Sequence, residues 1–459
     1  MDRRAFLGSA GGAALASPSK RPNILFLFAD DMRFDTVNNP EVRTPNLNRL
    51  AARGTHFTHA CIMGGTIGAV CVPSRGMLLT GQSLFHVQDS IIQPRNPRPF
   101  ALFPELLRQH GYATFGTGKW HNPPALFTRA FSHGADIFFG GMSDHLKVPV
   151  ADYDPSGRYP KEARRNGGKF SSELFTDAAI RFLEDYRGPE PFLMYVAYTA
   201  PHDPRMAPDQ YAAMYPPEKV RLPPSFLPQH PFDNGEMNVR DEALAPWPRT
   251  PEIVRQHIAA YYAMITHLDA QIGRLLGALE AAGRARDTMV IFAADNGLAV
   301  GRHGLFGKQN LYDHSVRVPL IIAGPGVARN KRTNGLHYIL DLCPTVCEMA
   351  GVPVPETVEG RSVLRGGRDS IFLAYRHFQR GVRTERWKLI LYHHGGRETA
   401  QLFEVEKDPW EMNNLAEAQP ARVRQLRGLL REWMQKVDDP LDLDQPDWGY
   451  RPDKIKGGS

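Results

Sequence analysis

The sequence predicts an α/β protein, with a doubly wound, mostly parallel sheet followed by a smaller C-terminal α+β subdomain. Apolar runs such as Asn23–Ala29 and Thr288–Ala294 have the unbroken hydrophobicity of strands that are buried on both faces. Segments with helical periodicity lie between these runs, an alternation that is typical of doubly wound sheets. Beyond Gly366, short strand patterns follow one another without intervening helices, which indicates an antiparallel sheet.

Length and composition are those of an ordinary globular protein. The chain has 459 residues, of which 42% are hydrophobic and 23% are charged, so it can form a substantial core. No apolar run approaches the roughly 20 residues of a membrane-spanning helix, so we expect no stable membrane insertion. The net charge of +6 comes without a long Lys or Arg block, so no nucleic-acid partner is indicated. The chain has 4 cysteines, too few for a disulfide framework.

The N-terminus resembles a bacterial twin-arginine export signal. Arg3 and Arg4 precede a weakly apolar stretch, and residues 14–16 (Ala-Leu-Ala) fit a small-x-small cleavage site. The alternative interpretation is an ordinary basic terminus. We expect residues 1–16 to be a signal peptide and the product to be periplasmic or secreted. Such proteins cross the membrane folded, which suits a protein that acquires a modification or a metal in the cytoplasm.

The elements of the large domain follow in order along the chain. After the first strand, a helix from Pro45 to Ala52 is predicted, with Thr44 as its N-cap and Gly54 at its end. Two proline-rich stretches, 121–170 and 203–250, show little periodicity and are predicted to be long functional loops. The other elements are helices at Leu102–His110, Ser172–Tyr186 and Pro251–Ala282, and strands at Pro191–Thr199, Thr288–Ala294 and Val318–Ala323.

The C-terminal subdomain is predicted to consist of short antiparallel strands closed by one helix. The expected limits are 21–365 for the large domain, 366–440 for the subdomain and 441–459 for a tail. The predicted elements are strands at Ile371–Tyr375, Arg380–Val382, Lys388–Tyr392 and Gln401–Val405, and a helix at Ala421–Val437.

Two predicted strands end directly in oxygen ligands. Asp30 and Asp31 follow the first strand, and Asp295 and Asn296 follow the strand Thr288–Ala294. Ligands of open α/β sheets bind at the carboxyl ends of strands, so these side chains are expected in one pocket. Clustered carboxylates repel one another unless a cation neutralises them, and oxygen ligands favour Ca²⁺ or Mg²⁺ over zinc. Each pair alone is better explained as a turn former, but two matched strand ends together favour a metal site.

The most specific motif begins at Cys71. The string from Cys71 to Gly81 (CVPSRGMLLTG) opens a predicted helix, with Arg75 one turn further on. The helix N-terminus and the arginine both favour negative charge at the Cys71 side chain. The alternative is a small buried cysteine. The whole string resembles the signature of the sulfatase family, in which the Cys of Cys-x-Pro-Ser-Arg is oxidised to formylglycine (3-oxoalanine).

Further motifs resemble the sulfatase family in the family's order, over most of the chain from about Arg21 to Leu415. The resemblance implies an alkaline-phosphatase-like fold. The matching strings are Pro22–Leu25 with Asp30-Asp31, Gly111–Thr114 with Gly118–His121, Ala200–Pro204, Ala294–Gly297, Gly307-Lys308 with Tyr312 and Arg317–Pro319, and Asp408–Glu411 with Asn414-Leu415.

The resemblance also implies the site residues. The implied metal ligands, for Ca²⁺ or alternatively Mg²⁺, are Asp30, Asp31, modified Cys71, Asp295 and Asn296. The implied catalytic residues are Cys71, Arg75, Lys119, His121, His202 and Lys308. The implied substrate contacts are Lys119, His202, His303 and Lys308.

The implied reaction is hydrolysis of a sulfate ester through a covalent enzyme-bound sulfate. One hydroxyl of hydrated formylglycine attacks the sulfur, favoured by the cation and Arg75. Lys119, Lys308 and the cation offset charge on the sulfuryl oxygens, while His202 protonates the leaving alcohol. His121 then takes the proton of the second hydroxyl, which expels sulfate and restores the aldehyde.

Several residues have local interpretations that the structure can test. Lys119 and His121 alternate on a predicted extended segment, which would place them on one face. Asp269, on the long helix, is predicted to be structural. Cys343 and Cys347 are one helical turn apart and are predicted to be core thiols.

Two alternative functions remain open from the sequence. One is a formylglycine-dependent phosphonate monoester or phosphodiester hydrolase, and the other is a noncatalytic protein that binds sulfated glycans. For the sulfatase, Trp120, Trp247 and Trp410 suggest a sulfated carbohydrate, by analogy only. The expected partners are therefore a small-molecule or oligosaccharide sulfate ester and a maturation enzyme that generates formylglycine.

Overall fold

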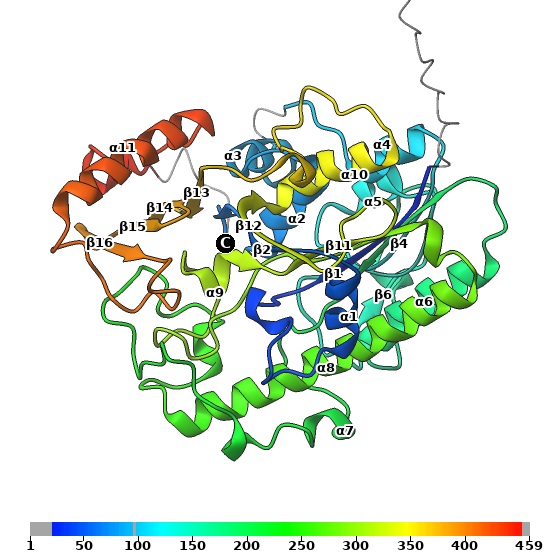
Figure 1. Cartoon of the computed structure of the whole chain (residues 1–459), viewed down its shortest axis with the longest axis horizontal. Coiled ribbons are helices and arrows are strands. Elements are labelled where there is room, and N and C mark those ends of the chain that lie inside the picture. Colours follow the sequence, from blue (N-terminus) through cyan, green and yellow to red (C-terminus); the bar gives the residue numbers. More distant parts are fainter. Residues whose placement is uncertain (1–20, 95–97, 452–459) are drawn as a thin grey trace, which may run out of the picture.

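A large mixed sheet crosses the centre of the molecule between two layers of helices (Figure 1). The structure is a computed structural model that describes residues 21–94 and 98–451, so the predicted signal at 1–16 lies outside the described residues. Within these residues the sheet has nine strands, ordered β10-β2-β11-β9-β1-β8-β4-β5, with β12 beside β2. The strands are β1 (Asn23–Ala29), β2 (Gly54–Cys61), β4 (Ala113–Lys119), β5 (His133–Phe138), β8 (Phe192–Ala197), β9 (Thr288–Ala294), β10 (Arg317–Val318), β11 (Leu320–Ala323) and β12 (Lys331–Tyr338).

The centre of the sheet is parallel, as predicted. Strand β1 lies between β8 and β9 and pairs in parallel with both of them. Every residue of these three strands is buried, which explains their unbroken apolar sequences. Because the strands run in one direction, the residues that follow them, including Asp30 and Asp295, meet at the same edge of the sheet.

The periphery of the sheet differs from the prediction. The segment Val318–Ala323 forms two short strands on either side of Pro319, and both pair antiparallel with β2. Proline has no amide hydrogen to donate to a ladder, so it interrupts the strand. The stretch 121–170 is not all loop, because it contains α5 (Pro124–Ala130) and the edge strand β5.

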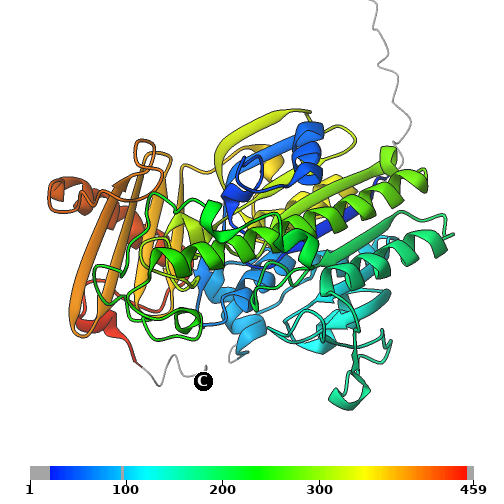
Figure 2. The same ribbon diagram turned by 90° about the horizontal axis from the view of Figure 1, so that it is seen from below.

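Helices cover both faces of the sheet (Figures 1 and 2). Helices α1, α6 and α8 lie on one side, and α2, α4 and α10 pack together on the other. Among the described residues, no helix combines the length and apolarity needed to cross a membrane. The helices are α1 (Pro45–Arg53), α2 (Cys71–Thr80), α3 (Leu84–Val87), α4 (Phe103–Gln109), α6 (Ser171–Asp185), α7 (Asp209–Ala212), α8 (Pro251–Ala281), α9 (Asp313–Val316) and α10 (Leu342–Ala350).

Helix α1 is capped by a residue far away in sequence. Thr44 precedes the helix as predicted, but its hydroxyl donates to the carbonyl of Thr36 and does not cap. The carboxylate of Asp269, on α8, accepts the backbone amides of Asn46 at 3.0 Å and Leu47 at 2.8 Å. A carboxylate at a helix N-terminus satisfies free amides and interacts favourably with the helix dipole. Asp269 is therefore structural, as predicted.

The C-terminal segment forms a second sheet at one end of the molecule, ordered β16-β15-β14-β13-β3, with α11 packed against it (Figure 1). Strands β13 to β16 are antiparallel, as predicted. The short β3 (Gly64–Gly65), just before Cys71, pairs with β13, so this sheet contacts the segment that leads into α2. The remaining elements are β13 (Ser370–Tyr375), β14 (Gln379–Thr384), β15 (Trp387–His394), β16 (Arg397–Glu404) and α11 (Pro420–Lys436).

Candidate active site

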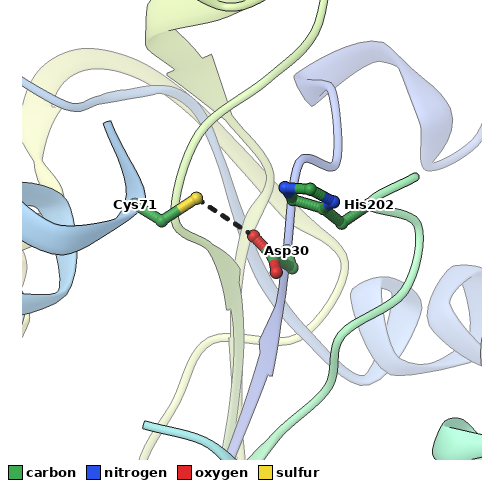
Figure 3. A group of neighbouring side chains, drawn as sticks. All are labelled: Asp30, Cys71 and His202. Carbon is green, nitrogen blue, oxygen red and sulfur yellow. Dashed lines mark hydrogen bonds between the residues drawn. The ribbon is translucent and has the colours of Figure 1, made fainter. Parts of the chain in front are cut away.

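The carboxyl ends of β1 and β9 bring three aspartates next to Cys71, the first residue of α2. Ligand atoms of Asp30, Asp31, Asp295 and Cys71 all lie within 4.8 Å of one another, and all four residues are buried. The sulfur of Cys71 is 3.3 Å from Oδ1 of Asp30, the contact drawn in Figure 3. His202 lies on the other side of Asp30 in the same view. The predicted metal pairs and the motif cysteine therefore form one cluster.

The turn that carries Asp31 is held by Tyr261 of α8. Asp31 has a left-handed φ of 62°, an uncommon conformation for a residue with a side chain. The hydroxyl of Tyr261 donates to the Asp31 carbonyl at 2.6 Å and accepts the Arg33 amide at 2.9 Å. Nothing in the sequence marks Tyr261 as part of the site, because a tyrosine in an apolar helix has the pattern of a core residue.

Three buried cations pair with the three carboxylates. Asn296 belongs to the same cluster, because its Nδ2 donates to the carboxylate of Asp31 at 2.6 Å. The predicted amide ligand therefore lies with the predicted carboxylate ligands. Lys308 has a second contact, because its Nζ lies 3.1 Å from the Cys71 sulfur. The ion pairs are Lys119–Asp30 at 2.5 Å, Lys308–Asp31 at 2.5 Å and Arg75–Asp295 at 3.0 Å.

The charge on Cys71 differs from the prediction. Burial, reinforced by Asp295 and Asp30, raises the pKa of the Cys71 thiol well above its usual value. Burial and Asp30 also raise the pKa of Asp295, to about 6. The predicted stabilisation of an anion at Cys71 is thus wrong for the unmodified thiol. Desolvation and the neighbouring carboxylates outweigh Lys119 and Lys308, which lower the pKa of this thiol.

Two histidines border the cluster. Nε2 of His202 lies 3.7 Å from Oδ2 of Asp31, and its Nδ1 lies 2.8 Å from the carbonyl oxygen of Asp203. Burial lowers the pKa of His202 to about 4, although Asp31 opposes this shift. Burial, reinforced by Lys119, lowers the pKa of His121 well below its usual value. Both rings are therefore neutral near pH 7 and able to accept a proton.

Lys119 and His121 reach the cluster by a different geometry from the predicted one. Strand β4 ends at Lys119, and His121 has a left-handed φ of 51°, so the extended segment does not continue. His121 still lies within electrostatic range of Lys119, Arg75 and Lys308. Within the described chain, the buried Nδ1 of His121 has no hydrogen-bond partner, which leaves it free for a ligand.

His303, an implied substrate contact, and Trp120, one of the tryptophans that suggested a carbohydrate substrate, both make structural contacts. The ring of His303 stacks on Tyr312 at 4.0 Å between centroids, and its Nε2 lies 3.1 Å from the Glu411 carbonyl oxygen. Trp120 is 1% exposed and packs edge-on against Phe127. These contacts place both residues in the packing of the core.

The cluster fits a hard divalent cation. Its donors are mainly carboxylate and amide oxygens, which Ca²⁺ and Mg²⁺ prefer. Within 21–94 and 98–451, Oδ2 of Asp31 and Oδ1 of Asn296 are buried without a hydrogen-bond partner. Buried oxygens without a partner cost free energy, and coordination to a cation would remove this cost. The residues present thus agree with the metal site predicted from the strand ends.

Comparison with known proteins assigns the family. The family model described as Sulfatase matches residues 22–352. The chain belongs to the sulfatase family. Its reaction is the hydrolysis of sulfuric esters, and the family resemblance of the sequence motifs is confirmed. A second model, N-sulphoglucosamine sulphohydrolase, C-terminal, matches residues 301–439.

Individual relatives agree with this assignment. An ulvan-active sulfatase of Formosa agariphila is 27% identical over 424 residues, which cover 86% of this chain and 77% of that protein. A solved structure in complex with its substrate D-glucosamine-2-N,6-O-disulfate superimposes with a TM-score of 0.75 at 23% identity, covering 94% of this chain and all of the other. The phosphonate monoester hydrolase of Agrobacterium radiobacter has a TM-score of 0.70 at 22% identity, covering 91% and 96%. The structural matches confirm the alkaline-phosphatase-like fold.

Proposed function

We propose that this protein removes sulfate from a sulfated carbohydrate, with formylglycine made from Cys71 as the nucleophile. The observation that carries the proposal is the position of Cys71, whose sulfur lies 3.3 Å from Asp30 and 3.1 Å from Lys308. This sulfur stands where formylglycine would carry its oxygen. Hydrated formylglycine supplies a hydroxyl nucleophile and a second hydroxyl on the same carbon, which permits release of sulfate.

The proposed ligands of a divalent cation, Ca²⁺ or alternatively Mg²⁺, are Asp30, Asp31, Asp295 and Asn296. The bound cation supplies Lewis acidity that favours the nucleophile and offsets charge on the ester. The carboxylates of this set are already paired with Lys119, Lys308 and Arg75. A divalent ion added to this balanced cluster would leave excess positive charge, which attracts an anionic sulfate ester.

Lys119 and Lys308 are proposed to hold the sulfate oxygens. Each ammonium group already lies against a carboxylate of the cluster, and sulfate oxygens would offer the same kind of negatively charged partner. Arg75 donates to Asp295 at 3.0 Å and to the Lys119 carbonyl at 2.8 Å. Its role is therefore to fix a metal ligand and a sulfate-binding residue in relation to each other.

His202 is proposed as the general acid and His121 as the general base. An anionic ester bound beside His202 would raise the pKa of this ring and allow it to carry the proton for the leaving alcohol. The neutral His121 ring, with its buried and unpaired Nδ1 in the described chain, is suited to take a proton from the second hydroxyl of residue 71.

The carbohydrate part of the proposal is supported by the substrates named for two relatives, ulvan and D-glucosamine-2-N,6-O-disulfate. The half-buried Trp247 and Trp410 remain candidate contacts for a sugar ring. The phosphonate hydrolase alternative has only a shared fold at 22% identity in its favour. Five of the six proposed catalytic side chains are buried, and this costly burial argues against a noncatalytic binding protein; they are Cys71, Arg75, Lys119, His202 and Lys308.

We also propose the route by which the enzyme matures. A formylglycine-generating enzyme would oxidise Cys71 in the cytoplasm, and the twin-arginine signal at residues 1–16 would direct export to the periplasm or the medium. In this scheme residues 21–365 are the catalytic domain, 366–440 are the C-terminal subdomain and 441–459 are a tail.

Two measurements test the proposal. The mass of the peptide that spans residue 71, taken from active protein, should be lower than that of the unmodified peptide. Kinetics with an aryl sulfate, an aryl phosphodiester and a panel of sulfated mono- and oligosaccharides should show a preference for a sulfated sugar. Full activity with an intact thiol, or a preference for the phosphodiester, would contradict the proposal.

A further inference from the structure

A short turn in the proline-rich stretch 203–250 contacts two segments of the active site directly and a third through one glutamine. It consists of Arg240, Asp241 and Glu242, the last of which begins a 3-10 helix, Glu242–Leu244. Asp241 and Glu242 are 5% and 4% exposed, which is unusual for two consecutive carboxylates. Their partners explain this burial.

Glu242 binds the backbone directly before Lys308. Its Oε1 accepts the amide of Gly307 at 2.8 Å, and its Oε2 accepts the amide of Phe306 at 2.9 Å. Arg249 donates to the same Oε2 at 2.7 Å, so the buried charge is paired. A Cβ atom at Gly307 would clash with Oε1 of Gln309 and would lie about as close to Asp241 as to Glu242, at 3.0 and 3.1 Å, so this close approach favours glycine before the lysine.

Asp241 is linked to Lys308 and Cys71 through Gln309. Its Oδ2 accepts Nε2 of Gln309 at 2.8 Å, and Oε1 of Gln309 accepts the Lys308 amide at 2.9 Å. The same Nε2 lies 3.2 Å from the carbonyl oxygen of Gly68, in the segment that leads into Cys71. One glutamine therefore connects the turn to both segments.

Arg240 links the turn to the segment of His202. Its Nη2 donates to Oδ1 of Asp203 at 3.0 Å and lies 2.5 Å from Oδ1 of Asp241. The carbonyl oxygen of Asp203 lies 2.8 Å from Nδ1 of His202. The turn thus contacts the segments that carry His202 and Lys308, and it reaches the segment before Cys71 through Gln309.

We infer that Glu242 is a positioning residue for Lys308, and that the Arg240–Glu242 turn sets Lys308 in relation to His202 and Cys71. The inference depends on the proposed function in one respect, the role of Lys308 in binding sulfate. A lysine side chain is long and flexible, so the direction of its ammonium group depends on a rigid backbone. Glu242 supplies that rigidity, because it holds the two amides that precede Lys308.

The variant Glu242→Gln tests this role with little change in volume. Glutamine has one acceptor oxygen, so it cannot serve both Arg249 and the two amides, and the buried negative charge is lost. Glu236→Gln is the matched control. Glu236 is a buried carboxylate of the same stretch, paired with Arg376 at 2.7 Å, and its partners lie in the C-terminal sheet.

Hydrogen–deuterium exchange gives a readout that does not need turnover. Glu242→Gln should speed amide exchange in peptides that cover residues 304–310, whereas Glu236→Gln should leave these peptides unchanged. If Glu242→Gln does not fold, Asp241→Asn replaces it in the experiment. This variant weakens the contact with Gln309 and should speed amide exchange in the same peptides. Unchanged exchange in the variants that fold would overturn the inference.

A double-mutant cycle separates positioning from general stability. Glu242→Gln should lower kcat/KM for an aryl sulfate by about 10- to 100-fold in the wild-type background. In the Lys308→Ala background the further loss should be much smaller, because there is no ammonium group left to position. Equal losses in both backgrounds would overturn the inference. Absence of any sulfate ester hydrolysis by the mature wild-type enzyme would instead contradict the proposed function, and the exchange measurement would still decide the role of Glu242.

Discussion

The ammonium nitrogen of Lys308 lies 3.1 Å from the sulfur of Cys71, although the two residues are 237 positions apart in the sequence. Lys308 belongs to the loop after β9, and Cys71 begins α2. The contact forms because the sheet brings the end of β9 to the start of that helix. The position of the proposed nucleophile is therefore next to positive charge before any substrate binds.

Replacement of Cys71 by serine should abolish multiple turnover. Serine has one hydroxyl on its Cβ, so a sulfated serine lacks the second hydroxyl that would expel sulfate. We expect either a stable sulfated protein or an inactive one, measured by intact mass and by aryl sulfate hydrolysis. Undiminished turnover by Cys71→Ser would rule out the formylglycine mechanism.

Tyr261→Phe should weaken binding of the divalent cation by about tenfold. The change removes the hydroxyl that holds both sides of the Asp31 turn, and an unpaired buried carbonyl or amide costs about 1–3 kcal/mol. Calorimetric titration of chelator-treated protein with Ca²⁺ measures the affinity directly. The neighbouring Tyr262→Phe, at a residue packed on Tyr215, serves as the control. Equal affinities for wild type and Tyr261→Phe would contradict the role assigned to this hydroxyl.

His86 should make stability depend on pH. Its ring bridges Glu359 at 2.6 Å and Asp438 at 2.9 Å, and the hydrogen bond to Glu359 raises its pKa above 6.5, although burial and Arg98 oppose the shift. Since the pKa is higher in the folded state, the stabilisation is complete below pH 6.5 and is lost as pH rises through the folded value.

The free energy of unfolding of wild type should therefore exceed that of His86→Gln most clearly at acidic pH. The difference should shrink as the pH rises through the folded-state pKa of His86. Urea unfolding at several pH values measures the free energies of unfolding of wild type and His86→Gln. A difference that stays constant with pH would exclude the charged bridge.

Lys388→Met should destabilise the protein by about 3–5 kcal/mol, because it leaves the buried carboxylate of Glu411 without a cation, whereas Asp313 keeps Arg383 and Arg317. Lys388, on β15, is completely buried and lies 2.9 Å from Asp313 and 2.6 Å from Glu411. Lys407→Met is the control, since solvent screens the pair of the exposed Lys407 with Glu404 and its loss should change the stability much less. Urea unfolding measures the free energy of unfolding of both variants. A similarly small decrease in this free energy for Lys388→Met and Lys407→Met would show that the buried network contributes little to stability.

Local patterns predict the centre of this fold well and its edges poorly. Strands β1 and β9 were predictable because burial on both faces demands an unbroken apolar run. Strand β12 begins with exposed polar residues, so its sequence carries no such signal. The direction of β11 depends on its pairing with β2 and β9, which no local pattern encodes.

The candidate site shows the same division. The aspartates after β1 and β9 and the Cys71 motif were predictable, because ligand chemistry and strand ends are local properties of the chain. Tyr261 and Glu242, which hold the backbone at Asp31 and before Lys308, could not be predicted from the sequence. Each of them contacts backbone that is distant in the sequence.

The sequence by itself determined which side chains can bind a cation and a sulfate group, and in what order they occur. Only the tertiary structure decided their charge and their precise neighbours. The motif alone favours an anion at Cys71, yet burial beside Asp30 and Asp295 raises the pKa of that thiol. The physical reason is that desolvation and electrostatic interactions depend on everything that the fold brings close, whereas propensity and motif chemistry depend on neighbours along the chain.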